Sequence, residues 1–199
     1  MNLHNTKTQT NLMRALAGET LARNRYELAA EAAQRQKLPV LAAVFRYTAG
    51  QEREHAEIFA GFLKAAGLDR VEISASYPVD AADDVRSLLQ AAAENEAREH
   101  LDVYPIFAKQ ARAEGFGEIG RIFEQIAQVE KCHAGRFESF LSLLEEGKLF
   151  RSDTACDWIC LNCGHEFNAE AAPEACPVCG KEGFFLRVES SPYSYHTIS

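Results

Sequence analysis

The sequence predicts a mainly α-helical protein, a four-helix bundle followed by a small domain of short β-type segments. Up to Leu149 the chain is rich in Ala, Glu, Leu, Arg and Gln, and apolar residues recur at alternating steps of three and four. After Gly147 the composition changes to Gly, Pro and paired cysteines. We therefore expect a helical domain at residues 1–149 and a second domain, stabilised by a metal, at residues 150–199.

Helix-breaking residues divide the first domain into four predicted helices, at residues 8–36, 39–67, 84–114 and 117–146. Pro39 suits the first turn of the second helix, and Gly67 suits its end. Gly115 and Gly117 separate the third helix from the fourth, and Gly147 closes the last one. Each helix carries one apolar stripe, which predicts the inward face of a bundle. The third stripe consists of Leu89, Ala92, Glu96, Glu99, Val103 and Ile106.

The connection between the second and third helices is long. It runs from Leu68 to Asp83, contains Pro78 and has no helical pattern. Extended at about 3.3 Å per residue, it can span a helix of about 28 residues that rises about 1.5 Å per residue. The other two joins are short and predict antiparallel hairpins. A long crossover between two hairpins is the ferritin-like form of the four-helix bundle.

Potential metal ligands interrupt all four apolar stripes, close to the midpoint of each predicted helix. They are Glu19, Glu52, His55, Glu96, Glu99, Glu130 and His133. Such side chains are costly in a core unless they are paired or bind metal. Two Glu-x-x-His motifs, completed by glutamates from the other two helices, are typical of di-iron and di-manganese bundles. The oxygen and nitrogen ligands suit Fe or Mn, and two dications bring five carboxylates close to neutrality.

Other polar residues in the helices have simpler interpretations. We expect the glutamates off the stripes to face solvent; these are Glu31, Glu54, Glu57, Glu94 and Glu124. We expect His4, His100 and His196 to be ordinary hydrogen-bonded histidines. Tyr26 and Tyr104 either donate a hydrogen bond to a ligand carboxylate or pack as core aromatic residues.

The second domain contains two Cys-x-x-Cys-Gly knuckles separated by twelve residues. Their cysteines are Cys160, Cys163, Cys176 and Cys179. Four thiolates predict a tetrahedral site for Fe or Zn, and the spacing does not decide between the two metals. Trp158, Phe184 and Phe185 supply apolar packing, and Cys156 and His165 are weaker alternative ligands. We expect Cys132, in the fourth helix, to be a packed or half-exposed thiol.

Composition excludes several classes of partner. The formal net charge of −8 argues against nucleic acid and against anionic membranes. The polar start of the chain does not resemble a secretory signal, and no apolar run has the length of a membrane-spanning helix. Paired cysteines in such a chain indicate metal binding in a reducing cytoplasm rather than disulfides.

With these motifs the sequence resembles the rubrerythrins over nearly its whole length. The resemblance is carried by residues 17–26 (AGETLARNRY), 52–56 (EREHA), 96–99 (EARE) with Tyr104 and Pro105, 130–133 (EKCH) and both knuckles. It implies a non-haem di-iron peroxidase that reduces hydrogen peroxide to water in the defence against oxidative stress. Departures from the family pattern are His165, where an aromatic residue is common, and an extended tail at residues 190–199, with Tyr193 and Tyr195.

The resemblance also implies roles for individual residues. Glu52 and Glu130 would bridge two irons, with Glu19 on the first iron and Glu96 and His133 on the second. The first iron would exchange Glu99, its ligand when oxidised, for His55 when reduced, and Tyr26 and Tyr104 would assist catalysis.

The family also implies a route for the electrons. The four cysteines would hold a rubredoxin-type iron that passes electrons to the di-iron pair. An external NAD(P)H-dependent reductase or a rubredoxin would supply them. Family members commonly form head-to-tail homodimers, so we expect such an oligomer in the cytoplasm.

Two other functions are compatible with the residues. In the first, the bundle oxidises and binds iron as ferritins do, and the four cysteines hold a structural zinc. In the second, the small domain docks a partner and the bundle site is vestigial. The intact set of ligands argues against the second.

Overall fold

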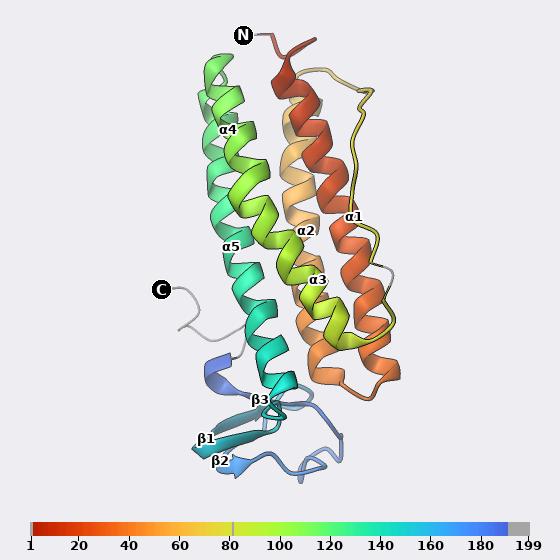
Figure 1. Ribbon diagram of the computed structural model, residues 1–199, viewed down its shortest axis with the longest axis vertical. Helices are drawn as coiled ribbons and strands as arrows, with labels where there is room; N and C mark the ends of the chain where they lie inside the picture. The colour runs from red at the N-terminus through yellow and green to blue at the C-terminus, as the bar shows by residue number, and fades with distance from the viewer. Residues whose placement is uncertain (1, 81, 191–199) are drawn as a thin grey trace.

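The protein is an elongated helical bundle with a small sheet at one end (Figure 1), and its computed structural model describes residues 2–80 and 82–190. The helices are α1 (Lys7–Arg35), α2 (Pro39–Ala65), α3 (Val85–Arg98), α4 (Tyr104–Ala113) and α5 (Gly117–Glu145). A π-helical segment, Glu99–Val103, joins α3 to α4, so these three elements form one long rod. The bundle therefore has four helical rods, as the sequence predicts.

Local sequence signals mark the ends of the helices. The hydroxyl of Thr6 accepts a hydrogen bond from the backbone N–H of Gln9 and caps α1. Asp84 caps α3 in the same way, through the N–H of Ser87. Pro39 occupies the first turn of α2, where its missing N–H leaves no helical bond unmade. Helix boundaries thus lie within about two residues of the predicted ones.

The long crossover has the predicted ferritin-like course. In Figure 1 it runs along the length of α1, from the end of α2 near the top to the start of α3 near the bottom. Two contacts join it to α1: the Tyr77 hydroxyl donates to the carbonyl oxygen of Arg14 at 2.8 Å, and Arg25 Nε lies 3.1 Å from Asp80 Oδ2. The segment is therefore attached to the bundle.

The third predicted helix is not a single α-helix. At its centre the N–H of Tyr104 bonds to the carbonyl of Glu99, five residues back. Pro105 has no N–H to give to an α-helical bond, which favours this wider turn. The π turn contains one residue more than an α turn, so the side chains of α4 are rotated about the helix axis. As a result, Tyr104 and Ala108 are buried. Ile106, which the stripe pattern placed inside, is 63% exposed, and that prediction is wrong.

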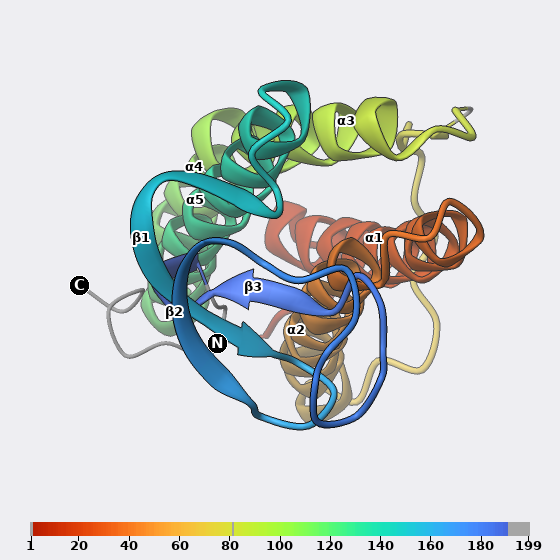
Figure 2. The same ribbon diagram turned by 90° about the horizontal axis from the view of Figure 1, so that it is seen from below.

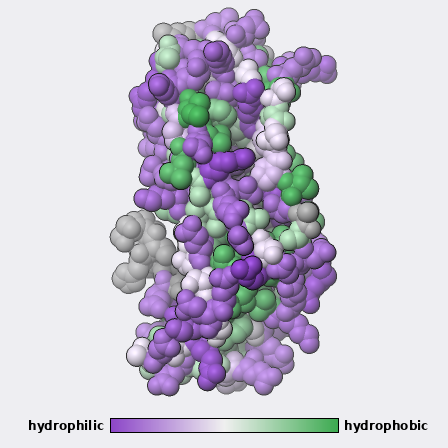
Figure 3. Space-filling view, viewed as in Figure 1, coloured by the Kyte–Doolittle hydropathy of each residue, from purple (hydrophilic) through white to green (hydrophobic). Residues whose placement is uncertain are grey.

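Apolar packing forms one cluster at each end of the bundle, with the polar mid-section between them. The cluster near the small domain includes Phe45 and Phe137, and the opposite cluster includes Phe59 and Phe123. On the face shown in Figure 3, hydrophobic side chains appear in small separate groups among hydrophilic ones. No helix in the described ranges has both the length and the apolar character needed to cross a membrane.

The small domain is an antiparallel sheet with the order β2-β1-β3 (Figure 2). Its strands are β1 (Arg151–Cys160), β2 (Glu166–Ala171) and β3 (Phe185–Arg187), followed by a 3-10 turn at Val188–Ser190. Trp158 and Phe185 are fully buried between the strands and the knuckles, and Phe184 packs against them half-buried. This confirms the predicted aromatic core.

The sheet docks on the end of the bundle at the α1–α2 turn. The N–H of Val40 donates to the carbonyl of Gly183 at 3.2 Å. Gly183 has a φ of +69°, and a Cβ there would lie 3.0 Å from Pro39 Cδ, so only glycine fits without a shift. Leu186 of β3 is buried in the adjacent bundle cluster. The two parts thus share an apolar contact. The tail with Tyr193, Tyr195 and His196 lies outside the described residues.

Candidate metal centres

Two overlapping groups of metal-ligating side chains lie in the middle of the bundle. One group is Glu19, Glu52, His55 and Glu130, and the other is Glu52, Glu96, Glu130 and His133. Within each group the ligand atoms lie within 4.8 Å of one another, and every member is buried. The two groups share Glu52 and Glu130. Two shared carboxylates place two metal positions side by side, with oxygen atoms available to both.

Helical periodicity brings these side chains together. Glu52 and His55 are three residues apart on α2, and Glu130 and His133 repeat this spacing on α5. Residues three apart project from one helix face, so each pair points inward as a unit. Glu19 on α1 and Glu96 on α3 complete the cluster from the other two rods.

The contact distances suit a shared cation site. His133 Nδ1 lies 2.7 Å from Glu130 Oε2 and 3.0 Å from Glu52 Oε1. His55 Nδ1 lies 3.0 Å from Glu130 Oε1 and 3.1 Å from Glu52 Oε2. The two imidazole rings are stacked, with centroids 5.7 Å apart. Each histidine therefore faces one oxygen of both shared carboxylates, in a nearly symmetric arrangement.

Several potential ligand atoms at this place are buried and make no hydrogen bond of good geometry, although the histidines and the shared carboxylates are in ion-pair contact. They are Glu19 Oε2, Glu52 Oε1, Glu96 Oε2, both carboxylate oxygens of Glu130, and His133 Nδ1. A buried polar atom without a good hydrogen bond is costly, so such a concentration of them favours a bound cation. Oxygen atoms with two imidazole nitrogens match the ligand preference of Fe or Mn. The residues present therefore fit a pair of such cations.

The pKa values of these side chains also indicate that the cluster favours positive charge. Burial raises the pKa of Glu19 and Glu96 well above the usual range, and neighbouring carboxylates raise it further. Burial also disfavours the charged forms of Glu52 and the histidines, but their mutual attraction prevails. The pKa of Glu52 is lowered, that of His55 is raised to about 9, and that of His133 is raised well above its usual value. Protons thus limit the net charge of the protein groups, a role that two dications would take over.

Glu99, the seventh predicted ligand, lies beside the two groups rather than within them. It belongs to the π-helical segment and lines a cavity next to the cluster. Burial raises its pKa to about 8, and the carboxylates of Glu130 and Glu52 add to the shift. The structure therefore has His55 in the cluster and Glu99 outside it.

The two tyrosines bond to carboxylates across the bundle. The hydroxyl of Tyr26 donates to Glu96 Oε1, and that of Tyr104 donates to Glu19 Oε1. Both rings are buried and also pack against phenylalanines. The two predicted interactions thus occur together: each hydroxyl bonds to a carboxylate of the cluster, and each ring packs in the core. Each hydroxyl orients one carboxylate of the cluster.

Sequence reasoning missed a polar chain on the outer side of His133. Its Nε2 lies 3.0 Å from Gln51 Oε1, which also accepts a hydrogen bond from Arg136 Nη1 at 3.1 Å. Arg136 in turn donates to Thr48 Oγ1 at 3.0 Å, and its guanidinium lies over the ring of Tyr47. Arg136 follows His133 by three residues, which places both on one face of α5 and was the available signal.

Among the described residues, the polar side chains expected to play no part in the site behave as predicted, with one exception. The five glutamates off the stripes are exposed. His100 Nδ1 bonds to the carbonyl of Ala127 at 2.8 Å, and His4 Nε2 to that of Ala66 at 3.0 Å. Cys132 is exposed rather than packed or half-exposed, because it lies on the outer face of α5.

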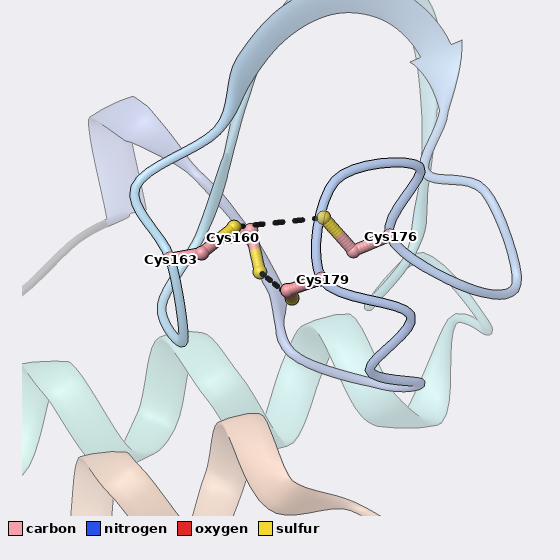
Figure 4. Close-up of side chains that lie close together, drawn as sticks. All are labelled: Cys160, Cys163, Cys176 and Cys179. Carbon is pink, nitrogen blue, oxygen red and sulfur yellow. Dashed lines mark hydrogen bonds between the residues drawn. The ribbon is translucent and has the colours of Figure 1, made fainter.

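Four cysteines form a second metal centre in the small domain. Their sulfur atoms lie within 4.8 Å of one another, with Cys160 and Cys179 3.8 Å apart and Cys163 and Cys176 3.7 Å apart. Figure 4 shows the sulfur atoms of the two knuckle loops pointing toward one another. Neither Cys156 nor His165 joins the group: Cys156 lies in β1, and the His165 ring stacks on Phe167. The structure thus assembles the tetrathiolate that the spacing predicts.

The knuckle turns direct backbone N–H groups at the sulfur atoms. Gly164 and Gly180 have φ values of +76° and +69°, which turn the chain at each loop. The N–H of the following residue, His165 or Lys181, then points at the preceding cysteine. The bond from Lys181 lowers the pKa of Cys179 to about 6. At Cys163 the bond from His165 also lowers the pKa, but desolvation and the neighbouring cysteines outweigh it and raise the pKa to about 12. Such bonds stabilise thiolates, the form that binds metal.

Comparisons with known proteins agree with this pair of centres. The sequence model of the family described as rubrerythrin matches residues 10–141, and that of its rubredoxin-like domain matches residues 158–184. The chain belongs to the rubrerythrin family. Rubrerythrin-1 of Clostridium acetobutylicum is 41% identical over 195 residues, covering 96% of this chain and 99% of the relative. A rubrerythrin of Porphyromonas gingivalis is 40% identical over 178 residues, covering 89% and 88%.

Solved structures support the fold of this rubrerythrin family member. Nigerythrin in its fully reduced, all-ferrous state superposes with a TM-score of 0.63 at 26% identity, covering 94% of this chain and 93% of the other. A bacterioferritin of Desulfovibrio desulfuricans, described with a diiron site in different catalytic states, has a TM-score of 0.65 at 25% identity. That likeness covers 71% of this chain and 82% of the other. The bundle is therefore ferritin-like, and the likeness to nigerythrin covers nearly the whole chain.

Proposed function

We propose that this protein reduces hydrogen peroxide to water at an iron pair in the bundle, with electrons delivered through an iron held by the four cysteines. The observation that carries this proposal is the pair of ligand groups sharing Glu52 and Glu130 in a chain that also carries a tetrathiolate site. Two adjacent ferrous ions supply two electrons and Lewis acidity to one O–O bond. The all-ferrous state described for nigerythrin supports iron as the metal here.

The ligand roles follow from which residues each group contains. Glu52 and Glu130 belong to both groups and are the candidate bridges. Glu19 with His55, and Glu96 with His133, are the terminal ligands of the two positions. Tyr26 and Tyr104 hold the carboxylates of Glu96 and Glu19 in place through their hydroxyls.

Glu99 and His55 are proposed as alternative ligands of the same position. His55 lies in the cluster in this structure, while Glu99 lines the adjoining cavity. A carboxylate is the better partner for the more highly charged oxidised metal, and a neutral imidazole for the reduced one. The exchange would therefore keep the net charge of this buried site low in both states.

Electron delivery between subunits is favoured by the position of the small domain. It contacts the first turn of α2 through Val40. Glu52 lies further along α2, about 18 Å from Val40 at about 1.5 Å rise per residue. The small domain therefore contacts the bundle well away from the metal ligands of its own subunit. A head-to-tail homodimer would bring the cysteine site of one subunit beside the bundle site of its partner. A cytoplasmic, NAD(P)H-dependent reductase or a rubredoxin would then resupply the electrons.

The alternative function is ferritin-like iron oxidation, with zinc in the cysteine site. The likeness of the bundle to bacterioferritin favours keeping this candidate. The two functions differ in the size of the assembly, because storage requires a closed shell and a peroxidase requires only a dimer or tetramer. They also differ in the cysteine site, because zinc cannot carry electrons.

The test is metal analysis of protein purified without oxygen, combined with peroxide turnover. We expect three irons per chain, the visible absorption of a ferric tetrathiolate, and consumption of hydrogen peroxide coupled to oxidation of NAD(P)H by an added reductase. Zinc in the cysteine site, or a large cage that consumes no peroxide, would contradict the proposal.

A further inference from the structure

A cavity of about 420 Å³ adjoins the bundle metal site. It lies between α1, the crossover segment at residues 74–78, and the start of α4. Glu99 and Tyr104 line it, and Tyr104 bonds to Glu19 of the cluster. The cavity therefore reaches the side of the metal site where Glu99 stands.

This cavity is much larger than hydrogen peroxide requires. A water molecule takes about 30 Å³ of liquid, so the cavity has room for on the order of ten molecules of that size. Pockets for organic molecules occupy about 300 to 1,000 Å³, which includes this volume. Much of its wall is apolar, from Ala15, Pro78, Val103, Ile106 and Phe107. The space thus suits an organic group better than a small polar molecule.

The outer wall is attached to the bundle at several points. The Tyr77 hydroxyl donates to the carbonyl of Arg14 at 2.8 Å, and Arg14 Nη2 donates to the carbonyl of Ser74 at 3.0 Å. A Cβ built on Gly18 would be in ordinary contact with the Tyr77 ring, at 3.5 Å, so the ring lies close against α1. The crossover and α1 therefore form one joined side of the cavity, which is partly open to solvent.

Charged groups of both signs surround the cavity, and Arg14 has no acid partner among the described residues; its Nη2 donates to the carbonyl of Ser74, and its Nε is buried without a hydrogen bond. Arg25 is paired with Asp80, and both side chains are about nine-tenths buried. Arg98 and Asp102, which carry opposite charges, are exposed at the rim. The apolar part of the wall, formed by Ala15, Val103 and Phe107 among others, is the feature that favours a compact apolar group.

We infer that the protein also reduces organic hydroperoxides, whose apolar part occupies this cavity while the O–O bond faces the metal site. The inference rests on the proposed function, because the same reduced metal pair supplies the electrons. The O–O bond of ROOH breaks, two electrons from the metal pair and two protons from solvent are consumed, and the products are ROH and H₂O. Ala15, Val103 and Phe107 would select R by shape.

The test compares cumene hydroperoxide with hydrogen peroxide in the fully metal-loaded protein. Val103→Phe and Ala75→Trp introduce larger side chains at two separate points of the cavity wall. If one variant misfolds, the other still tests the inference. The matched control is Val79→Phe, because Val79 is 87% exposed in the same crossover and does not line the cavity. A second measurement follows binding of 2-phenylpropan-2-ol, the inert product alcohol, by ligand-observed NMR.

We expect the ratio of kcat/KM for cumene hydroperoxide to that for hydrogen peroxide to fall about ten-fold or more in each filled variant. Alcohol binding should weaken in parallel, and Val79→Phe should match the wild type in both measurements. If the wild type reduces hydrogen peroxide but neither reduces cumene hydroperoxide nor binds the alcohol, the inference is wrong and the proposed function stands. If it reduces neither peroxide, both are wrong.

Discussion

Gln51 Oε1 lies 3.0 Å from His133 Nε2 and accepts a second hydrogen bond from Arg136. A carbonyl oxygen cannot donate, so this contact assigns a proton to Nε2, and Nδ1 is the nitrogen that would give up its proton and bind a metal. His55 faces the same carboxylates through Nδ1, but in the described ranges its Nε2 makes no such bond. The outer nitrogen of His133 is therefore held by a hydrogen bond, and that of His55 is not. This difference agrees with His55 as the exchangeable ligand.

Replacing Gln51 by Leu should weaken metal binding at the bundle site by about 10- to 100-fold, because the outer partner of a ligating histidine sets its tautomer and orientation. Chelator competition on the metal-loaded protein measures the affinity. Gln51→Glu keeps an acceptor and should bind metal nearly as well as the wild type. Gln90→Leu, on an exposed part of α3, is the matched control. Equal affinity in Gln51→Leu and Gln90→Leu would show that the anchor is unimportant.

Replacing Glu99 by Ala should slow hydrogen peroxide turnover at least ten-fold while the fold stays intact. The reason is the proposed exchange with His55, which requires the Glu99 carboxylate when the metal is oxidised. Circular dichroism and metal content check the fold, and stopped-flow kinetics measure turnover. Glu94→Ala, an exposed glutamate of α3, serves as the control. Retention of the wild-type rate would remove Glu99 from the mechanism.

Replacing Cys160 by Ala should block steady-state turnover but not a single oxidation of the pre-reduced bundle site. Cys160 is one of four sulfur ligands, and it is buried in the core of the small domain. Its loss opens the tetrathiolate without touching the bundle. Single-turnover and steady-state peroxide consumption are compared, with Cys132→Ala as the control because that thiol is exposed on α5. Undiminished steady-state turnover would mean that the small domain is not the relay.

Replacing Glu114 by Ala should destabilise the protein by about 1 kcal/mol at pH 7, the usual effect of losing a helix cap. Glu114 follows α4 and accepts hydrogen bonds from the backbone N–H of Lys7 and from both the N–H and the hydroxyl of Thr8, at the start of α1. It thus joins the first helix to the α4–α5 turn. Urea unfolding of this variant and of Glu138→Ala, on the exposed face of α5, measures the difference.

The Glu114 effect should also depend on pH. Partial desolvation raises the pKa of this carboxyl, but the bonds from Thr8 and Lys7 outweigh it and lower the pKa below its usual value. A lowered folded-state pKa stabilises the fold at pH values above the unfolded pKa of about 4.3. The difference between wild type and Glu114→Ala should therefore shrink as the pH falls through about 4 and below. A difference that stays constant between pH 7 and pH 3 would contradict this assignment.

Some features of the protein are local in sequence and could be predicted from it. A helix begins at Pro39 because proline has a fixed φ and no N–H, and helices end at Gly115 and Gly147 because glycine readily adopts a positive φ. Steps of three and four place Glu52 with His55, and Glu130 with His133, on inward faces whatever the neighbouring helices do. The Cys-x-x-Cys-Gly spacing predicts a knuckle for the same reason. Six of the side chains that cluster in the bundle and the four clustered cysteines could therefore be identified without coordinates.

Other features depend on how separate rods are rotated and spaced, which no local pattern encodes. The π turn at Glu99–Val103 shifts the register of α4 by one residue, exposing Ile106 and placing Glu99 beside the cluster instead of within it. The hydroxyl of Tyr26 reaches Glu96 on another rod, and Gln51 meets Arg136 across α2 and α5. The cavity exists only because the crossover lies against α1. Such contacts join residues far apart along the chain, so only the packed structure decides them.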